Sequence, residues 1–157
     1  MTSNVISGLT VALLQISSPA FKDNDFIPSK FTCEGESTSP ELHVKNIPAN
    51  AKTLAIILDD PDATHGTFVH WVAWNISPTE TISEHTTSAT MGNNGAGKKG
   101  YIGPCPPSGI HHYHFKIYAL DTKLNLPEGS GKQELLDAMK GHIVGSGELI
   151  GLYKKVK

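Results

Sequence analysis

The sequence of 157 residues has little net charge and no long apolar run, and each shortage excludes a class of protein. The formal net charge is −2, and the basic runs are no longer than the pairs Lys98–Lys99 and Lys154–Lys155. We therefore expect no nucleic-acid partner. No apolar run could span a bilayer, so stable membrane insertion is not expected. Residues 1–16 lack a positive start and a small-residue cleavage site, which favours the cytoplasm over secretion.

Cysteine is nearly absent, since Cys33 and Cys105 are the only two and both lie in loop-like surroundings. Two cysteines do not make a disulfide framework, and their spacing does not match a zinc motif. In a reducing cytosol they would be free thiols. A disulfide stays open as the alternative, because the sequence does not give their separation.

Known enzyme and metal motifs are also missing. The sequence contains no HExxH and no P-loop, and Ser108 does not lie in a G-x-S-x-G elbow. The eight histidines do not have the spacing of zinc ligands, so neither a metal nor a cofactor is expected.

What is present is the composition of one soluble domain, residues 1–157, with 38% hydrophobic and 18% charged residues. Strand-like segments dominate and no helices alternate with them. The expected strands are 10–16, 42–47, 53–58, 68–76, 112–121 and 148–153. The apolar run Thr53–Leu58 suits a strand buried on both faces. We predict a mainly β fold, an antiparallel sandwich with long connections and one late helix.

Residue periodicity gives further detail. A period of two puts Phe68, His70, Val72, Trp74 and Ile76 on one strand face, and Val69, Trp71 and Ala73 on the other. It also puts His111 and Tyr113 on one side of their strand. The helix is expected at Lys132–Lys140, with Ser130 and Gln133 at capping-box spacing. Ser77–Gly100 is expected to be a long loop.

Two clusters of residues could carry chemistry. The first is acidic and follows a strand, with Asp59, Asp60 and Asp62 before His70. The second is the stiff loop Gly103–Gly109, rich in proline and glycine, followed by His111 and Tyr113. Carboxylates, imidazoles, a phenol and free backbone amides together can hold a small oxyanion.

Each residue also has a purely structural interpretation. Asp60 precedes Pro61 and could simply cap a turn. His70 could be a core histidine with its hydrogen bonds satisfied, and Tyr113 a core aromatic. Cys105 could be a reactive thiol, although no base is evident nearby.

The two clusters lie within recognisable signatures. Residues 58–76, LDDPDATHGTFVHWVAWNI, resemble the first signature of the phosphatidylethanolamine-binding protein family, also called Raf kinase inhibitor-like proteins. Residues 100–121, GYIGPCPPSGIHHYHFKIYALD, resemble the second. The segments SSPAF, FTCEGESTSPEL and GHIVGSGELIGLYKK are similar to its bacterial and archaeal branch, so the resemblance covers nearly the whole chain.

The resemblance implies two antiparallel sheets in Greek-key order and a small pocket for phosphate, phosphorylethanolamine, nucleotides or similar anions. By motif position it implies these ligand-binding residues: Asp60, Asp62, His70, Gly103, Cys105, Pro106, Pro107, His111 and Tyr113. The sequence departs from the family pattern where DPDAT replaces DPDAP and where histidine-arginine-tyrosine becomes His111-His112-Tyr113. His112 thus offers a weaker, titratable donor in place of arginine.

We therefore expect a binding protein that holds a small anion through loop amides, the Tyr113 hydroxyl and one histidine. A carboxylate beside a phosphate needs a proton or a cation between them. Asp60 should share a proton with the ligand, hold His70 charged, or meet a ligand ammonium. The resemblance also implies a regulatory role as an inhibitor of a kinase or a serine protease, with the loop 77–99 as the candidate surface. A small hydrolase using the same pocket is the alternative, and a homodimer is left open.

Overall fold

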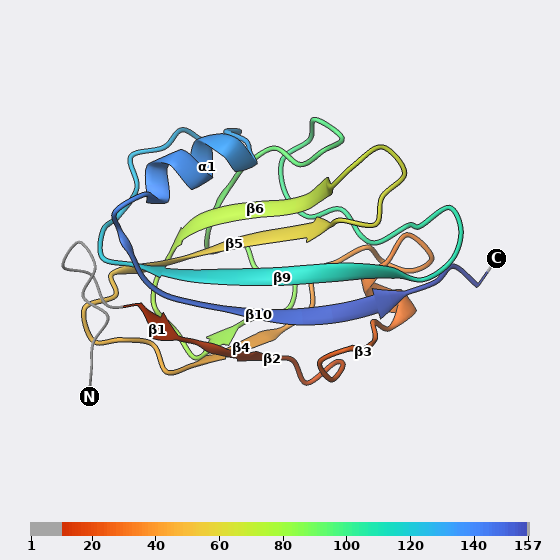
Figure 1. Ribbon diagram of the computed structural model, residues 1–157, viewed down its shortest axis with the longest axis horizontal. Helices are drawn as coiled ribbons and strands as arrows, with labels where there is room; N and C mark the ends of the chain where they lie inside the picture. Colours follow the sequence, from red (N-terminus) through yellow and green to blue (C-terminus); the bar gives the residue numbers. More distant parts are fainter. Residues whose placement is uncertain (1–10, 157) are drawn as a thin grey trace.

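The computed structural model describes residues 11–156, which form two β-sheets and one α-helix (Figure 1). Residues 1–10 lie outside the described residues. The start of the first predicted strand, Thr10, and most of the segment used to argue against a signal peptide are among them. No helix between residues 11 and 156 is long and apolar enough to cross a membrane.

The large sheet has seven strands in the order β1-β10-β9-β5-β6-β8, with β3 also paired to β10. Their bounds are β1 (Ala12–Leu13), β3 (Asp25–Phe26), β5 (Thr53–Asp60), β6 (Phe68–Ile76), β8 (Thr90–Met91), β9 (His111–Leu120) and β10 (Ile143–Tyr153). The small sheet is β2-β4-β7, with β2 (Gln15–Ser17), β4 (Leu42–Lys45) and β7 (Thr81–Ile82). The pairs are antiparallel except that β1 and β3 run parallel to β10, a departure from the predicted all-antiparallel pairing.

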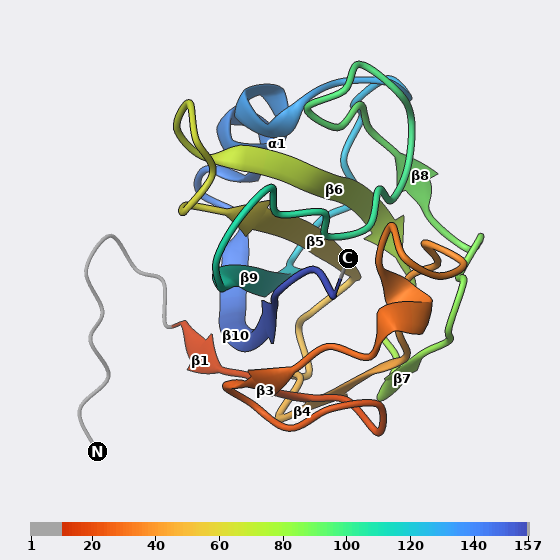
Figure 2. The same ribbon diagram turned by 90° about the vertical axis from the view of Figure 1, so that its right-hand side faces the viewer.

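The large sheet is covered on both faces, by α1 (Lys132–Met139) on one and by the small sheet on the other (Figure 2). One apolar cluster joins the two sheets and includes Leu58, Phe115 and Leu42. A second lies under the helix and includes Ile57 and Leu135. All eight residues of β5 are buried, which agrees with its continuous apolar run.

Three segments differ from the predicted elements. The predicted strand 10–16 is divided at Leu14, so that β1 joins the large sheet and β2 joins the small one. The last strand begins at Ile143, five residues before the predicted start. The expected loop 77–100 contains β7 and β8, whose two-residue pairings are too short to leave a periodic signal.

The predicted face assignment of β6 is wrong, because the strand is irregular at two places. The β5–β6 register shifts between Leu58 and Asp59, with His70 as the extra residue of β6, and Asn75 has a φ of 56°. Such bulges re-aim side chains. His70 and Phe68 therefore do not share a face with Val72 and Trp74, which pack under the helix. His70 instead contacts Tyr113, whose ring belongs to the cluster between the sheets.

The helix agrees with its prediction apart from its start. Its N-cap is Gly131, whose N–H donates to Glu134 Oε1 at 2.9 Å, so the cap lies one residue after the predicted Ser130. The helix ends at Met139, and Gly141 adopts a φ of 80°, as expected for a helix stop.

Candidate functional site

A cavity of about 350 Å³ opens at the end of the large sheet where β5 stops and β6 starts. Figure 1 shows the connection between these two strands. Its walls are the connection 63–67, the N-terminal part of β6, the loop 102–107 and the start of β9. This volume suits a small organic ligand. Eight predicted ligand residues line it: Asp60, His70, Gly103, Cys105, Pro106, Pro107, His111 and Tyr113. That they bind a ligand stays a prediction.

His70 is fixed in one orientation by the loop before β9. Its Nδ1 donates to the carbonyl oxygen of Ile102 at 2.8 Å, and the Ile102 N–H donates back to the His70 carbonyl at 2.9 Å. A carbonyl only accepts, so the proton of neutral His70 lies on Nδ1 and Nε2 carries a lone pair. Burial lowers the pKa of His70, which favours this neutral form.

Asp60 and His111 form a buried pair in the same cavity. Asp60 Oδ2 lies 2.7 Å from His111 Nδ1, and Asp60 Oδ1 accepts the Asp62 N–H at 2.8 Å. Both carboxylate oxygens thus have partners. The sequence suggested that Asp60 could pair with His70. In the structure Asp60 pairs with His111 instead. Because Asp60 accepts the hydrogen bond from His111 Nδ1, the other ring nitrogen, Nε2, is left for a ligand.

Tyr113 lies between the two imidazoles, with its ring centroid 5.3 Å from that of His70 and 6.4 Å from that of His111. His111 and Tyr113 share a strand face, as the period of two predicts. The Tyr113 hydroxyl is buried and has no hydrogen-bond partner of ordinary geometry within residues 11–156. Burial, followed by the nearby charge of Asp60, raises its pKa, so it is a phenol and a potential donor.

The proline-rich wall supplies fewer amides than the sequence suggested. Three residues of Gly103–Pro107 are prolines, which have no N–H, and the Gly103 N–H already donates to Ser37 Oγ at 2.9 Å. Cys105 is left as the one candidate donor of that segment. The wall is instead a rigid support: a Cβ on Gly103 would lie 2.7 Å from the carbonyl oxygen of Phe31.

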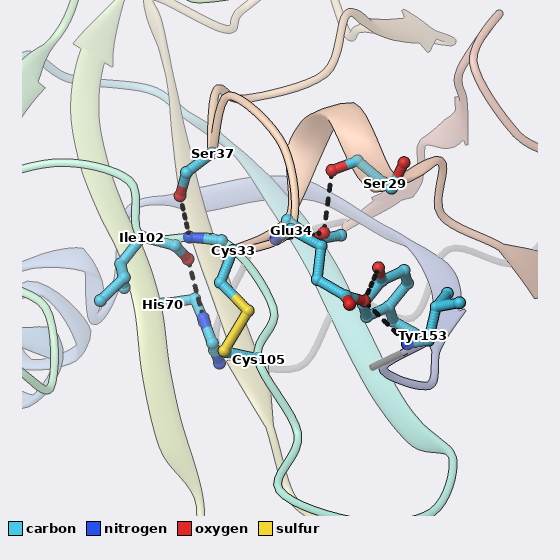
Figure 3. The surroundings of a disulfide bond; sticks show 11 residues. Ser29, Cys33, Glu34, Ser37, His70, Ile102, Cys105 and Tyr153 are labelled. Atoms are coloured by element: carbon cyan, nitrogen blue, oxygen red, sulfur yellow. Dashed lines mark hydrogen bonds between the residues drawn. A yellow bond between two sulfur atoms is a disulfide. The ribbon is translucent and has the colours of Figure 1, made fainter.

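The structure joins Cys33 to Cys105, whose Cα atoms are 5.4 Å apart (Figure 3). The expectation of free thiols is therefore wrong for this structure, and the disulfide alternative holds. Both cysteines are exposed at the surface, and Cys105 also lines the cavity. Beside the disulfide, the Cys33 N–H donates to Pro104 O at 3.0 Å, so the segment 29–37 holds the cavity wall in place.

Two of the predicted acidic residues lie outside the cavity. Asp62 is exposed and binds His112 instead, accepting its N–H at 2.8 Å and contacting its Nδ1 at 2.7 Å. The hydrogen bonds from His112 lower the pKa of Asp62. Asp59 faces the helix side of β5, where the Nζ of Lys132 lies 2.8 Å away. The alternation of side chains along a strand puts neighbouring aspartates on opposite faces.

Sequence reasoning missed the connection that forms the opposite rim, which includes Thr64, His65 and Thr67. Its position was implied, because a short turn between adjacent antiparallel strands must lie at the same sheet end as the strand termini. It also missed the carbonyl of Ile102, which no side-chain motif could indicate. Within residues 11–156, no group of three histidine, cysteine or acidic residues could hold a metal ion.

Within residues 11–156, the cavity lining has no permanently charged cationic side chain. No lysine occurs among the described lining residues, and the sequence contains no arginine. The groups that face the cavity are therefore one buried carboxylate, imidazoles and a phenol. Positive charge can arise there only by protonation of a histidine.

The fold and this site define a class: a two-sheet β protein with one small polar cavity at a sheet end. The sequence profile of the family described as Phosphatidylethanolamine-binding protein matches residues 17–154. The chain belongs to the phosphatidylethanolamine-binding protein family.

Relatives of the chain occur in archaea and bacteria. It is 49% identical over 154 residues to a UPF0098 protein of Pyrococcus abyssi, covering 91% of this chain and 86% of the relative. Among solved structures, a putative phosphatidylethanolamine-binding protein homolog from Chlamydia trachomatis has a TM-score of 0.88 and 41% identity, covering 91% of this chain and 98% of that one. YbcL of E. coli, described as a new member of the mammalian family, has a TM-score of 0.81 and 27% identity, covering 90% of this chain and 98% of that one.

Proposed function

We propose that this protein binds a small anion, such as phosphate or phosphorylethanolamine, in the cavity between β5 and the loop 102–107. One observation carries the proposal: the buried hydroxyl of Tyr113 makes no hydrogen bond of ordinary geometry in the described chain, and it lies beside the Asp60 carboxylate and two imidazoles anchored through Nδ1. Leaving a buried polar group unsatisfied is costly, so a retained one is explained by a ligand that binds it. The Nε2 atoms, the phenol and the Cys105 amide then surround the ligand oxygens.

Isothermal titration with phosphorylethanolamine tests this proposal. His70→Ala should weaken binding by about tenfold or more, since it removes a hydrogen-bonding group of the cavity. Asp60→Ala should change the affinity, since it removes both the partner of His111 Nδ1 and a negative charge beside the ligand. Asp62→Ala and His112→Ala are matched controls, because this pair lies outside the cavity lining. Unchanged affinity in both cavity variants would rule the site out.

We further propose a regulatory role without catalysis, as an inhibitor of a kinase or a serine protease. The segment 77–99 stays the candidate contact surface. Its exposed parts are residues 77–78, 80–81, 83–85, 87–88 and 95–99, and β7 and β8 hold it at two points. A tethered, exposed segment of this kind suits a rigid inhibitor. Incubation with chymotrypsin-like proteases tests the protease arm, and no inhibition at micromolar concentration would remove it.

A small hydrolase is the second candidate, and the Asp60–His111 pair favours it. A carboxylate at Nδ1 orients an imidazole so that Nε2 can act as a general base. Against it, the disulfide removes the Cys105 thiol as a nucleophile. Turnover of phosphate or carboxylate esters that disappears in His111→Ala and persists in His112→Ala would support this candidate over simple binding.

A further inference from the structure

His70 has a spare nitrogen that can bind a ligand oxygen only if a proton lies between them. Its Nδ1–H is committed to the Ile102 carbonyl, so Nε2 of the neutral ring is an acceptor, as are all oxygens of a fully ionised anion. Two acceptors repel unless one of them is protonated. An anion whose oxygen meets His70 Nε2 must therefore carry a proton or bring one to His70.

The groups around His70 increase this requirement. From β5, Asp60 contributes negative charge within the cavity, while Asp59 lies on the opposite face beside Lys132 and Lys116. From β9 come His111 and the un-ionised Tyr113. Phe68 of its own strand packs edge-on at a centroid distance of 4.9 Å. His65, on the connection 63–67, is exposed and lines the same cavity.

No fixed cation offsets the carboxylate of Asp60 in this cavity. The described lining has no lysine, and the chain has no arginine. A dianion entering beside Asp60 would place like charges close together in a partly desolvated site. The proton is thus the one positive charge that the site itself can recruit.

We propose that the site binds a phosphoryl ligand together with one proton, shared between His70 Nε2 and an oxygen of the ligand. This inference rests on the proposed anion-binding function and specifies the ligand class: oxyanions basic enough to hold a proton near neutral pH. Phosphate monoesters qualify because their second pKa is about 6. Sulfate esters have the same shape but hold no proton at neutral pH, so the site rejects them.

Linkage gives the expected size of the effect. If the complex holds one more proton than the separated partners, affinity falls about tenfold for each pH unit above their pKa values. A site built only on fixed N–H and O–H donors would bind the fully ionised anion without taking up a proton, so its affinity would not fall in this range.

The experiment is isothermal titration of the full chain with phosphorylethanolamine and with 2-aminoethyl hydrogen sulfate, which differs only in the acid group. Titrations at pH 6.5 and pH 8, each in two buffers of different ionisation enthalpy, count the protons taken up. We expect about one proton per phosphoryl ligand at pH 8. We also expect about tenfold or greater loss of affinity from pH 6.5 to 8, and at least tenfold weaker binding of the sulfate ester.

Variants assign the proton to its site. His70→Gln keeps a polar side chain that does not titrate, and proton uptake should fall below half a proton. Tyr113→Phe should weaken binding with uptake unchanged, and His43→Gln, on β4 of the small sheet, should change neither. Thermal melts of each variant check that it is folded.

The outcomes separate two failures. Binding of the phosphoryl ligand without proton uptake, equal binding of the sulfate ester, or full uptake in His70→Gln would each overturn this inference and leave anion binding standing. No binding of phosphorylethanolamine at either pH would overturn the proposed function and this inference with it.

Discussion

Tyr113 carries a polar hydroxyl on a side chain that lines the cavity and is closed to bulk solvent. The side chain is fully buried, and its hydroxyl is the one buried side-chain polar atom of residues 11–156 that makes no hydrogen bond of ordinary geometry, although the Asp60 carboxylate lies near it. If apolar packing were the only requirement at this position, phenylalanine would meet it without a hydroxyl. The phenol is therefore poorly satisfied in the ligand-free protein, and a ligand oxygen in the cavity would satisfy it.

Tyr113→Phe should accordingly affect stability and binding in opposite directions. Removing the unsatisfied hydroxyl should leave the free energy of unfolding unchanged or raise it by about 1 kcal/mol. Affinity for phosphorylethanolamine should fall about tenfold. Urea denaturation and isothermal titration measure the two effects. A destabilised variant with full affinity would contradict the assigned role.

His70 makes the stability of the ligand-free protein depend on pH. Its pKa in the folded state lies below the ordinary value of 6.5 because burial disfavours the charged ring. Below pH 6.5 the unfolded chain takes up a proton that the folded protein resists. Stability should therefore be complete above pH 6.5 and decline as the pH falls toward the lowered folded pKa.

The His70 contribution is at most about 1.4 kcal/mol per pH unit in that window. Melting temperatures of wild type and His70→Gln from pH 7.5 to 5 isolate it, since the two proteins differ only at residue 70. The variant should lose less stability on acidification. Parallel curves would show that His70 is not buried in its neutral form.

At the scale of elements, the strands that carry the site follow from their sequences. The run Thr53–Leu58 gave a doubly buried strand, and the alternation after His112 gave the buried face of β9. The bulge at His70 could not be predicted, because both faces of β6 are apolar and a shifted register leaves the same pattern. Yet this bulge turns His70 toward Tyr113. The orientation of His70 therefore depends on how β5 and β6 pair and not on the local sequence of β6.

The loop before β9 depends on glycine for close approach. A Cβ at Gly103 would lie 2.7 Å from Phe31 O and 2.9 Å from Thr32 Cα, both backbone atoms. Gly103→Ala must push the loop away from the segment 29–37. We expect a loss of about 2 kcal/mol of stability and weaker anion binding, measured by urea denaturation and calorimetry.

Gly109 supplies the matched control for that loop. Its φ is 70° but nothing lies within 4 Å of a Cβ placed there. Gly109→Ala should cost only backbone strain, about 1 kcal/mol, and leave binding intact. If both glycine variants reduced affinity equally, close approach at Gly103 would not be the cause.

At the scale of the whole molecule, the site exists because distant segments meet at one end of the large sheet. Cys33 and Cys105 are 72 residues apart in sequence, and nothing local to either indicates the other. The same holds for Asp60 and His111, which are 51 residues apart. The family resemblance named about half of the lining residues, but the rim 63–67, the pairing of Asp60 with His111 and the outward position of Asp62 needed the structure.

The disulfide should be a large part of the protein's stability. Closing a loop of this length stabilises a fold by about 4 kcal/mol in the chain-entropy model. Replacing both cysteines, Cys33→Ser with Cys105→Ser, should therefore lower the melting temperature by about 10 °C. Differential scanning calorimetry measures the shift.

The thiol state bears on the compartment as well, because disulfides persist in oxidising surroundings and cytosolic thiols are usually kept reduced. Thiol alkylation of protein trapped directly from cells, followed by mass measurement, distinguishes the two states. Alkylation of both cysteines, together with an unchanged melting temperature in the double variant, would contradict a stabilising disulfide.

The most direct test of the central claim is a crystal structure of the protein grown with saturating phosphorylethanolamine. The account predicts the phosphoryl group in the cavity, with its oxygens within hydrogen-bond distance of His70 Nε2 and the Tyr113 hydroxyl. The ligand bound elsewhere, for instance beside Lys116 and Lys132, with this cavity free of it, would contradict the account.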